Sequence, residues 1–336
     1  MEYRKLGRSG LTVSRLCLGT MMFGDTTDEK TSKRIVDMAR DAGINFIDTA
    51  DVYGRGASEE VTGRAIKRQR ADWIVATKAG QPFDPKDPNK VGLTRRWLTH
   101  QLDASLKRLG TDHVDIFYFH REDLNTALEE TVAAVGDLIR AGKARYFGLS
   151  NFRAWRHAEV ARLCDAMGVD RPVVSQPYYN AFNRMPETEV LKACDHYGMG
   201  VVPYSPIARG VLTGKYKAGK APARGSRAAR KDMRMMQTEF REESLVMAER
   251  VVAHAKARGI SPVHFAVNWV LANPYVTAAI AGPRTPEQME GYFGCFDHPW
   301  TAEDEALINE LVAPGHSSTH GYNDPGYPIE GRPVQV

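Results

Sequence analysis

The sequence of 336 residues lacks the features that mark several large classes of protein. Its four cysteines are scattered without CxxC spacing, which indicates neither a disulfide framework nor a thiolate metal site. Neither sign of charge dominates, because 45 Lys and Arg face 41 Asp and Glu, so composition predicts no nucleic-acid partner. The charged start MEYRKLGRSG does not resemble a signal peptide, and the most apolar stretch, 264–282, is interrupted by Asn268, Asn273 and Pro274. These absences predict a soluble cytoplasmic protein with no membrane partner.

The glycine patterns of common nucleotide-binding loops are also missing. The segment GRGASEE (54–60) has the first two glycines of a dinucleotide-binding fingerprint but no third, and TGKYKAGK (213–220) lacks P-loop spacing. The chain is 43% hydrophobic and 26% charged, which is ordinary for a globular protein and excludes global disorder. The sequence therefore predicts a folded globular protein that has neither the dinucleotide-binding glycine fingerprint nor a P-loop.

Short β-branched, apolar segments alternate with longer amphipathic segments along the chain. The segments that predict strands are 15–19, 44–48, 73–78, 114–120, 144–150, 173–177, 200–205 and 276–282. Helices are predicted at 94–109 and 126–139, because apolar residues recur there three and four positions apart. Strands that are apolar on both faces are typical of a parallel sheet covered by helices. The pattern predicts an α/β fold that is a single (β/α)8 TIM barrel, with a doubly wound sheet as the alternative.

Three segments depart from this alternation. Residues 2–16 alternate around a central Ser-Gly, which predicts a β-hairpin that plugs one end of the barrel. Residues 209–240 form a long basic loop without a clear period, inside a barrel domain that spans 1–313. Residues 314–336 are predicted to form an irregular C-terminal tail over the barrel.

The basic loop has two interpretations. Between Lys215 and Arg234 there are eight basic residues and one acidic residue, Asp232. One interpretation is a lid that closes over an anionic ligand, with Lys215 and Arg224 as its contacts. The other is a solvated charged loop, which is the usual role of such runs.

Polar side chains end most of the predicted strands, which is where a barrel of this kind carries its active site. They are Asp48, Lys78, His120, Ser150, Asn151, Gln176, Tyr204 and Ser205, and Tyr53 follows Asp48 by five residues.

An ammonium group at the end of a buried strand needs a partner, and Asp48 on the adjacent strand is the nearest candidate for Lys78. This pair is either a structural salt bridge or part of a catalytic site. A nearby ammonium lowers the pKa of a phenol, so Tyr53 is predicted to titrate well below a free tyrosine. His120 is either a hydrogen-bond donor to the same carbonyl oxygen or a buried core histidine.

These residues lie in motifs that resemble the aldo-keto reductase family over nearly the whole chain. The motifs include LGTMMFG (18–24), GINFIDTADVYG (43–54), RLGTDHVDIFYFH (108–120) and VVPYSPIARGVLTGKY (201–216). The resemblance implies a (β/α)8 barrel that binds NAD(P)H in an extended form and reversibly reduces an aldehyde or ketone to an alcohol.

The family's catalytic tetrad matches Asp48, Tyr53, Lys78 and His120 without substitution. The resemblance implies that Tyr53 is the general acid, that Lys78 held by Asp48 lowers its pKa, and that His120 orients the substrate. Met22 and Phe23 are expected to form the substrate pocket together with Tyr53 and His120.

The resemblance also implies contacts along the whole cofactor. Ser150, Asn151 and Gln176 match residues that hold the nicotinamide carboxamide, and Tyr204 matches an aromatic residue that stacks on the nicotinamide ring. The other cofactor positions are Thr20, Met21, Asp48, Ser205, Pro206, Ile207, Arg209, Lys215, Gly282, Pro283, Arg284, Gln288 and Tyr292. The family often has Asn at the position of Tyr292, so stacking on adenine is expected there in place of a hydrogen bond.

Arg284 predicts NADPH as the cofactor, with NADH as the alternative. A planar guanidinium binds a phosphate through two hydrogen bonds, which a ribose hydroxyl would not need. The alternative interpretation of Arg284 is an exposed arginine at the start of a helix.

Two other functions remain open at the level of sequence. The first is a redox-sensing, NADPH-binding regulatory subunit that resembles the β-subunits of potassium channels, although those have Asn where this chain has His120. The second is a barrel lyase that uses Lys78 as a Schiff base, which leaves Tyr53 and Gln176 without roles. No metal site is predicted, because His316 and His320 lack further ligands. The substrate is a small carbonyl compound that the sequence does not name, and no pattern indicates an oligomeric state.

Overall fold

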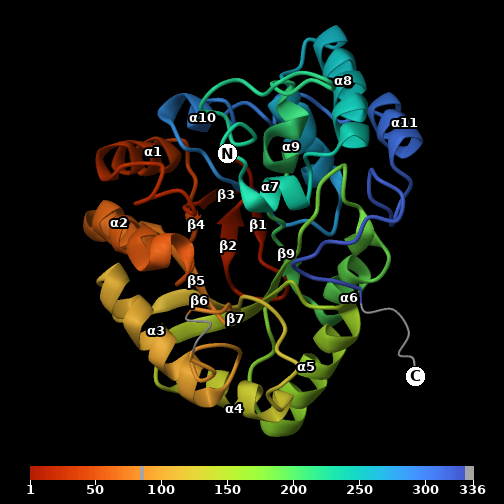
Figure 1. The fold of residues 1–336 in the computed structure, drawn as a ribbon. Helices are drawn as coiled ribbons and strands as arrows, with labels where there is room; N and C mark the ends of the chain where they lie inside the picture. The colour runs from red at the N-terminus through yellow and green to blue at the C-terminus, as the bar shows by residue number, and fades with distance from the viewer. Residues whose placement is uncertain (84–86, 330–336) are drawn as a thin grey trace.

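Eight parallel strands form the centre of the computed structural model, which describes residues 1–83 and 87–329 (Figure 1). Their order in the sheet is β10-β3-β4-β5-β6-β7-β8-β9. The strands are β3 (Leu16–Gly19), β4 (Phe46–Asp48), β5 (Ile74–Ala79), β6 (Val114–Phe119), β7 (Ala144–Ser150), β8 (Val174–Gln176), β9 (Gly200–Val201) and β10 (Ala279–Ala281). A parallel bridge between Val201 and Val276 joins the two ends of the sheet, and Thr277 N donates to Val201 O at 2.8 Å. The predicted barrel is therefore confirmed, and the doubly wound alternative is wrong.

Helices surround the strands on the outside of the barrel (Figure 1). They are α1 (Glu29–Asp41), α2 (Ala57–Ile66), α3 (Arg95–Leu109), α4 (Leu128–Arg140), α5 (Ala154–Met167), α6 (Val190–Tyr197), α8 (Glu242–Ala257), α9 (Pro262–Ala272), α10 (Pro286–Glu290) and α11 (Ala302–Leu311). The short helix α7 (Met233–Gln237) instead lies over the mouth of the barrel, near the centre of Figure 1.

Helix α3 shows why the periodic segments fold as they do. The Thr94 side chain accepts a hydrogen bond from Trp97 N at its start, and Gly110 ends it in the left-handed conformation at φ 64°. The leucines that recur three and four positions apart, among them Leu98 and Leu102, are buried against the barrel. Burying each such side chain stabilises the fold by about 2 kcal/mol.

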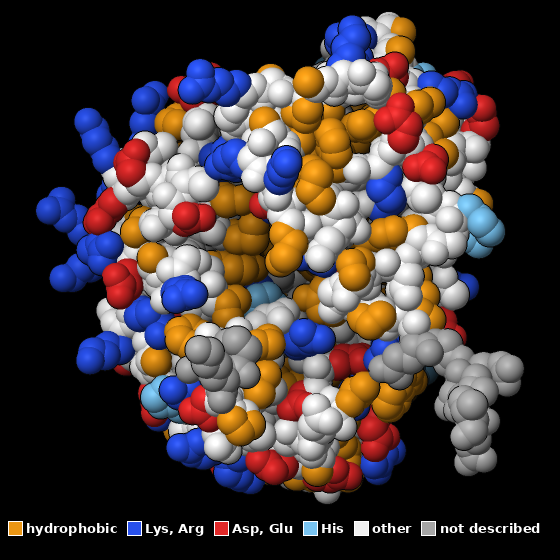
Figure 2. Space-filling view, in the orientation of Figure 1, with side chains coloured by type: hydrophobic (Ala, Val, Ile, Leu, Met, Phe, Trp, Pro, Cys, Tyr) orange, Lys and Arg blue, Asp and Glu red, His pale blue; other side chains and the backbone are white. Residues whose placement is uncertain are grey.

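The loops at one end of the barrel surround a hollow near the middle of the face drawn in Figure 2. After α11, residues 314–329 form turns and bends. Gln81 Nε2 donates to Tyr327 Oη at 3.0 Å, and Arg153 Nη2 donates to Pro328 O at 3.1 Å. These bonds attach the tail to the loops that follow β5 and β7. The remainder of the predicted tail, 330–336, lies outside the described residues.

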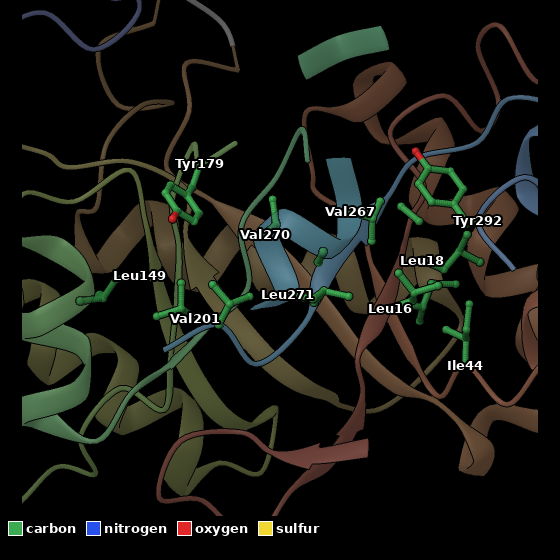
Figure 3. Close-up of a cluster of buried hydrophobic side chains, with 14 of the residues drawn as sticks. Leu16, Leu18, Ile44, Leu149, Tyr179, Val201, Val267, Val270, Leu271 and Tyr292 are labelled. Carbon is green, nitrogen blue, oxygen red and sulfur yellow. The ribbon is translucent and has the colours of Figure 1, made fainter. Parts of the chain in front are cut away.

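Two layers of apolar side chains fill the structure. The outer layer packs the strands against the helices, and Figure 3 shows Val267, Val270 and Leu271 of α9 among side chains such as Leu16 and Val201. The inner layer fills the barrel itself, and its members are Leu6, Val13, Cys17, Phe46, Ala76, Ile116, Tyr118, Val174, Val202, Ala278 and Ile280. The barrel is a packed core rather than a pore.

The N-terminal hairpin belongs to the inner layer. Its strands β1 (Tyr3–Lys5) and β2 (Thr12–Ser14) pair antiparallel, which confirms the predicted hairpin. Leu6 and Val13 are wholly buried, and a Cβ on Gly7 would lie 2.6 Å from Gly200 N. Because Gly200 begins β9, the hairpin closes the amino-terminal end of the barrel.

The structure differs from the sequence prediction in two segments. The strand predicted at 200–205 is limited to Gly200–Val201, because Pro203 has no N–H to donate to a neighbouring strand. The loop predicted at 209–240 contains α7 and a 3-10 segment, η4 (Ala208–Thr213). Its buried residues, such as Tyr216, Ala228 and Met235, are too far apart to produce a helical period.

None of the helices in residues 1–83 and 87–329 combines the length and the apolar character that crossing a membrane requires.

Candidate active site

A cavity of 930 Å³ lies at the carboxyl ends of the strands, and the predicted tetrad lies at it. Asp48 is the last residue of β4, Lys78 lies near the end of β5, and His120 follows β6. Tyr53 begins the 3-10 segment η1 (Tyr53–Gly56) in the loop after β4. Asp48, Tyr53 and His120 line the cavity, while the Lys78 side chain is wholly buried beneath them.

Lys78 uses its ammonium group to join two members of the tetrad. Its Nζ donates to Asp48 Oδ1, to Thr49 O at 2.8 Å and to Tyr53 Oη at 3.3 Å. The second Asp48 oxygen accepts from Gln176 Nε2 at 2.9 Å. Burial acts to lower the pKa of Lys78, but the neighbouring Asp48 carboxylate and the Tyr53 phenol outweigh burial and raise it. Lys78 therefore carries its charge at neutral pH.

The direction predicted for the Tyr53 pKa is wrong in this structure. Burial raises the pKa of Tyr53, and the Lys78 ammonium opposes this effect without reversing it. The reason is that the phenol lies in the protein interior. A phenolate there loses more hydration free energy than its attraction to one ammonium group restores. The hydroxyl is thus protonated at neutral pH, which is the state that donates a proton.

His120 is a neutral imidazole beside Tyr53. Burial, with Lys78 and Arg121 nearby, holds the pKa of His120 well below its ordinary value. Its ring lies edge-on to the Tyr53 ring, with centroids 5.8 Å apart. His120 Nδ1 is buried and has no hydrogen-bond partner among the described residues.

Beyond the tetrad, the ends of β7, β8 and β9 present a polar and aromatic wall. Tyr204 Oη donates to Asn151 Oδ1 at 2.8 Å, and Asn151 Nδ2 donates to His120 O at 2.9 Å. Ser150 Oγ donates to Gln176 O at 3.0 Å. Gln176 lines the cavity, and its Nε2 is bound to Asp48.

Tyr204 has an aromatic support behind it. The Tyr178 ring stacks on it with centroids 5.5 Å apart and an angle of 17° between planes, while Tyr204 itself lines the cavity. The loop that follows holds Ser205, Ala208 and Arg209 at φ 60°, 48° and 48°. Side chains other than glycine rarely adopt this conformation, and such strain gathers at ligand sites.

A basic group lines part of the cavity. It consists of Lys215, Arg227 and Arg284. Burial and then the charges of Arg284 and Arg227 lower the pKa of Lys215, which shows that these cations lie close together. Arg227 pairs with Asp232 at 3.0 Å, so the group keeps excess positive charge suited to an anion.

Both Arg209 and Arg224 are predicted to contact the ligand, but only Arg209 lines the cavity. Arg209 lines the cavity, but its Nε pairs with Glu239 at 2.8 Å and its side chain is only 8% exposed. Arg224 is exposed and is not among the residues that line the cavity. Arg227 was not singled out from the sequence, although it lies in the basic run 215–234.

Most of the other predicted site residues line the same cavity. They are Thr20, Met21, Met22, Ser205, Pro206, Ile207, Gly282, Gln288 and Tyr292. Phe23 and Pro283 do not line it. Phe23 is wholly buried in the outer core layer, so its placement in the substrate pocket is corrected. The sequence did not predict the burial of Phe23, because Met22, the residue directly before it, does line the cavity.

The cavity also has walls that were not predicted from the sequence. Val52, Gln81, Arg121 and Tyr327 line it as well. Val52 lies within the motif 43–54, but no role was predicted for it. Tyr327 lies in the tail, whose sequence has no periodic pattern from which its position could be predicted.

Across the part of the chain that the structure describes, no three His, Cys, Asp or Glu side chains gather in a way that suits a metal ion. Cys17, Cys164, Cys194 and Cys295 are free and buried.

The residues present fit an extended dinucleotide. The cavity has a supported aromatic ring and amide groups near the tetrad, and it also has a basic group in its wall. A stacking surface suits a nicotinamide ring, and the cations suit phosphate groups. The fold and the site together define an NAD(P)H-dependent oxidoreductase on a (β/α)8 barrel.

Comparison with known proteins identifies the family. The model described as "Aldo/keto reductase family" matches residues 15–313. The chain belongs to the aldo-keto reductase family, whose members act on small carbonyl compounds with NAD(P)H. This confirms the resemblance found in the sequence.

Three relatives show the range of names among similar proteins. The chain is 37% identical to "Uncharacterized oxidoreductase YrpG" of Bacillus subtilis, over 96% of this chain and 99% of that protein. It is 37% identical to "Probable voltage-gated potassium channel subunit beta" of Oryza sativa, over 86% of this chain and 89% of that protein. It is 33% identical to "L-glyceraldehyde 3-phosphate reductase" of Escherichia coli, over 94% of this chain and 93% of that protein.

Proposed function

We propose that the protein reduces an aldehyde or ketone to an alcohol with NADPH, reversibly and with Tyr53 as the general acid. The observation that carries this proposal is the buried chain from Asp48 through Lys78 Nζ to Tyr53 Oη, which ends at the cavity wall beside His120. When bound, the cofactor supplies the hydride.

The side chains of the tetrad then have distinct roles. Tyr53 Oη gives its proton to the carbonyl oxygen, and the Lys78 ammonium, 3.3 Å away, stabilises the phenolate that remains. Asp48 keeps Lys78 charged and oriented. His120, as a neutral imidazole, hydrogen-bonds the carbonyl oxygen and orients it toward Tyr53.

Replacing the proton donor tests this proposal. Tyr53→Phe should lower kcat/KM for aldehyde reduction by at least about a hundredfold, because it removes the proton donor. NADPH binding, measured by fluorescence titration, should change little. The control is Tyr275→Phe, which alters an exposed tyrosine outside the cavity. Turnover retained in Tyr53→Phe would rule out the role assigned to this residue.

The basic group supports NADPH over NADH. Arg284→Ala should raise KM for NADPH about tenfold or more, because a charge-assisted hydrogen bond to a phosphate is lost. KM for NADH should change much less. Lys217→Ala, an exposed lysine of the same basic run that does not line the cavity, is the control. Equal effects of Arg284→Ala on both cofactors would contradict the preference.

A regulatory NADPH-binding subunit is a second candidate function. It is supported by the identity of 37% to the potassium channel β-subunits named in rice and in Arabidopsis thaliana. The complete tetrad, with its neutral His120, favours the enzyme. Tight NADPH binding without multiple turnover on a panel of aldehydes would favour the regulatory role.

A further inference from the structure

Three buried hydroxyl groups lie together beside the active-site cavity. They belong to Thr20, Thr49 and Ser58, each of which is wholly buried, and Thr20 is part of the cavity wall. Thr20 follows β3, Thr49 follows β4, and Ser58 is the second residue of α2. The Ser58 oxygen lies 2.9 Å from Thr20 Oγ1 and 3.0 Å from Thr49 Oγ1. No role was predicted for Thr49 or Ser58 from the sequence, and the proposed reaction does not use the Ser58 hydroxyl.

Ser58 is the centre of this hydroxyl cluster, because its oxygen both donates and accepts. Each hydroxyl has a single hydrogen to donate. Ser58 Oγ donates its hydrogen to Thr20 O at 2.7 Å, so Thr49 Oγ1 must be the donor in its bond to Ser58 Oγ. Without the Ser58 hydroxyl, these two buried groups lose this partner, and a buried polar group that loses its partner destabilises the arrangement that holds it.

The bond between Thr49 and Ser58 closes the loop that carries Tyr53. Tyr53 lies between these two residues in the chain, and so do Arg55 and Gly56, which have φ of 54° and 97°. Arg55 is strained, because side chains other than glycine rarely adopt this conformation. A strained loop keeps its shape only while the surrounding contacts hold it. The Thr49–Ser58 bond is such a contact, because it joins the two ends of the loop.

The same hydroxyl cluster reaches the buried ion pair of the site. Lys78 Nζ donates to Thr49 O at 2.8 Å, and the hydroxyl of the same threonine donates to Ser58. On the other side, Thr20 N donates to Asp48 O at 3.0 Å. Ser58 is thus separated by a single residue from each member of the ion pair, although it does not line the cavity itself.

Thr62 shows that a buried hydroxyl in α2 need not belong to such a cluster. It lies one turn after Ser58 in the same helix and is also wholly buried. Its oxygen has no hydrogen-bond partner among the described residues. Removing the Thr62 hydroxyl therefore leaves every contact of the site in place, which makes it a matched control for Ser58.

We infer that Ser58 is a positioning residue, which holds Tyr53 Oη next to Lys78 Nζ for proton transfer. The inference rests on the proposed function for the role of Tyr53. Misplacing a reacting group by about 1 Å lowers a rate by up to about a hundredfold. Because Ser58 acts through Thr49 and does not line the cavity, its loss should lower kcat rather than raise KM.

Kinetics with NADPH and propanal test this division between kcat and KM. Ser58→Ala should lower kcat about tenfold and change KM for either compound by less than about twofold. Thr62→Val, which removes the buried hydroxyl without a partner, should leave both constants unchanged. An unchanged kcat in Ser58→Ala, or a loss that comes through KM alone, would overturn the inference.

A double-mutant cycle tests whether Ser58 acts through Thr49. Thr49→Val removes the hydroxyl that donates to Ser58 and keeps the carbonyl that binds Lys78, so it should lower kcat about as much as Ser58→Ala. The double variant should fall less than about twofold below either single variant, because both substitutions break one bond. Losses that multiply would overturn the inference. Thr49→Val also keeps the test decisive if Ser58→Ala does not fold.

Crystal structures test the positioning without turnover. The distance from Tyr53 Oη to Lys78 Nζ, 3.3 Å with the Ser58 hydroxyl present, should exceed about 3.6 Å in Ser58→Ala and in Thr49→Val, and stay unchanged in Thr62→Val. An unchanged distance in the first two variants would overturn the inference. A longer distance in those variants, in a protein whose wild type reduces no aldehyde, would support the positioning by Ser58 and contradict the proposed reductase activity instead.

Discussion

At the scale of single residues, the site depends on one buried ion pair. The Lys78 side chain is wholly buried and the Asp48 side chain is 3% exposed. Burying one of these charges without the other costs free energy of folding. Replacing only one of the two residues therefore destabilises the protein. The same pair serves stability, by neutralising two buried charges, and chemistry, by placing an ammonium at the phenol oxygen.

These two roles are separable by mutation. Lys78→Met should destabilise the protein by about 3–5 kcal/mol, because it leaves the Asp48 carboxylate buried without a cation. Adding Asp48→Asn to that variant removes the charge and should restore much of the stability, as measured by urea unfolding. Reduction of aldehydes should stay lost in both variants, because no ammonium remains beside Tyr53. Recovered activity in the double variant would contradict the role of Lys78.

At the scale of elements, the loop that carries Tyr53 and the helix α2 that follows it are anchored to α3 and β5 by two buried carboxyl groups. Asp51 Oδ2 accepts from Gln101 Nε2 at 2.9 Å. Glu59 accepts from Thr77 Oγ1 at 2.5 Å and from Arg108 Nε at 2.6 Å. Arg108 binds Glu59 directly and acts on Asp51 only through its charge. Burial, reinforced by Glu59, raises the pKa of Asp51 to about 8, while Arg108 and Lys78 act in the opposite direction.

This anchoring predicts a pH-dependent stability. The unfolded chain loses the Asp51 proton near pH 4, whereas the folded chain keeps it to about pH 8, so stability falls as pH rises between these values. Asp51→Asn keeps an acceptor for Gln101 and cannot ionise. Its free energy of unfolding relative to wild type should therefore rise from pH 5 to pH 8, by up to about 1.4 kcal/mol for each tenfold fall in proton concentration.

Thermal unfolding at several pH values measures this difference. The control is Asp195→Asn, which alters an exposed aspartate. A constant difference between Asp51→Asn and wild type across pH 5 to 8 would show that Asp51 ionises in the folded protein as it does in the unfolded chain.

At the scale of the whole molecule, the two ends of the chain serve opposite ends of the barrel. The N-terminal hairpin contributes Leu6 and Val13 to the inner core. The C-terminal tail lies at the mouth, where Tyr327 lines the active-site cavity. Among the described residues, neither core layer has a buried member after Val312. The hairpin is therefore needed for folding, and the tail shapes the site.

Shortening the tail tests this division. A chain that ends at Gly321 should keep its fold, with an unfolding temperature within about 4 °C of wild type, because it loses no core residue. KM for the aldehyde substrate should rise, because Tyr327 is gone from the wall of the active-site cavity. Leu6→Ala is the comparison and should cost about 2–5 kcal/mol of stability without altering KM. A shortened chain that fails to fold would show that the tail is needed for folding as well, and would contradict the separate roles given to the hairpin and the tail.

The sequence by itself determined the barrel and the place of the tetrad. Periodicity of apolar residues is a local property, so α3 was predicted at 94–109 and lies at Arg95–Leu109. In a barrel the strand ends converge, so polar residues at those ends, such as Asp48 and Lys78, meet without knowledge of the loops.

Only the tertiary structure decided what depends on contacts between distant segments. Phe23 packs into the core while Met22 faces the cavity, and Tyr327 arrives at the site from the tail. The pKa of Tyr53 is raised because burial outweighs the Lys78 charge, a balance that residue types alone do not reveal.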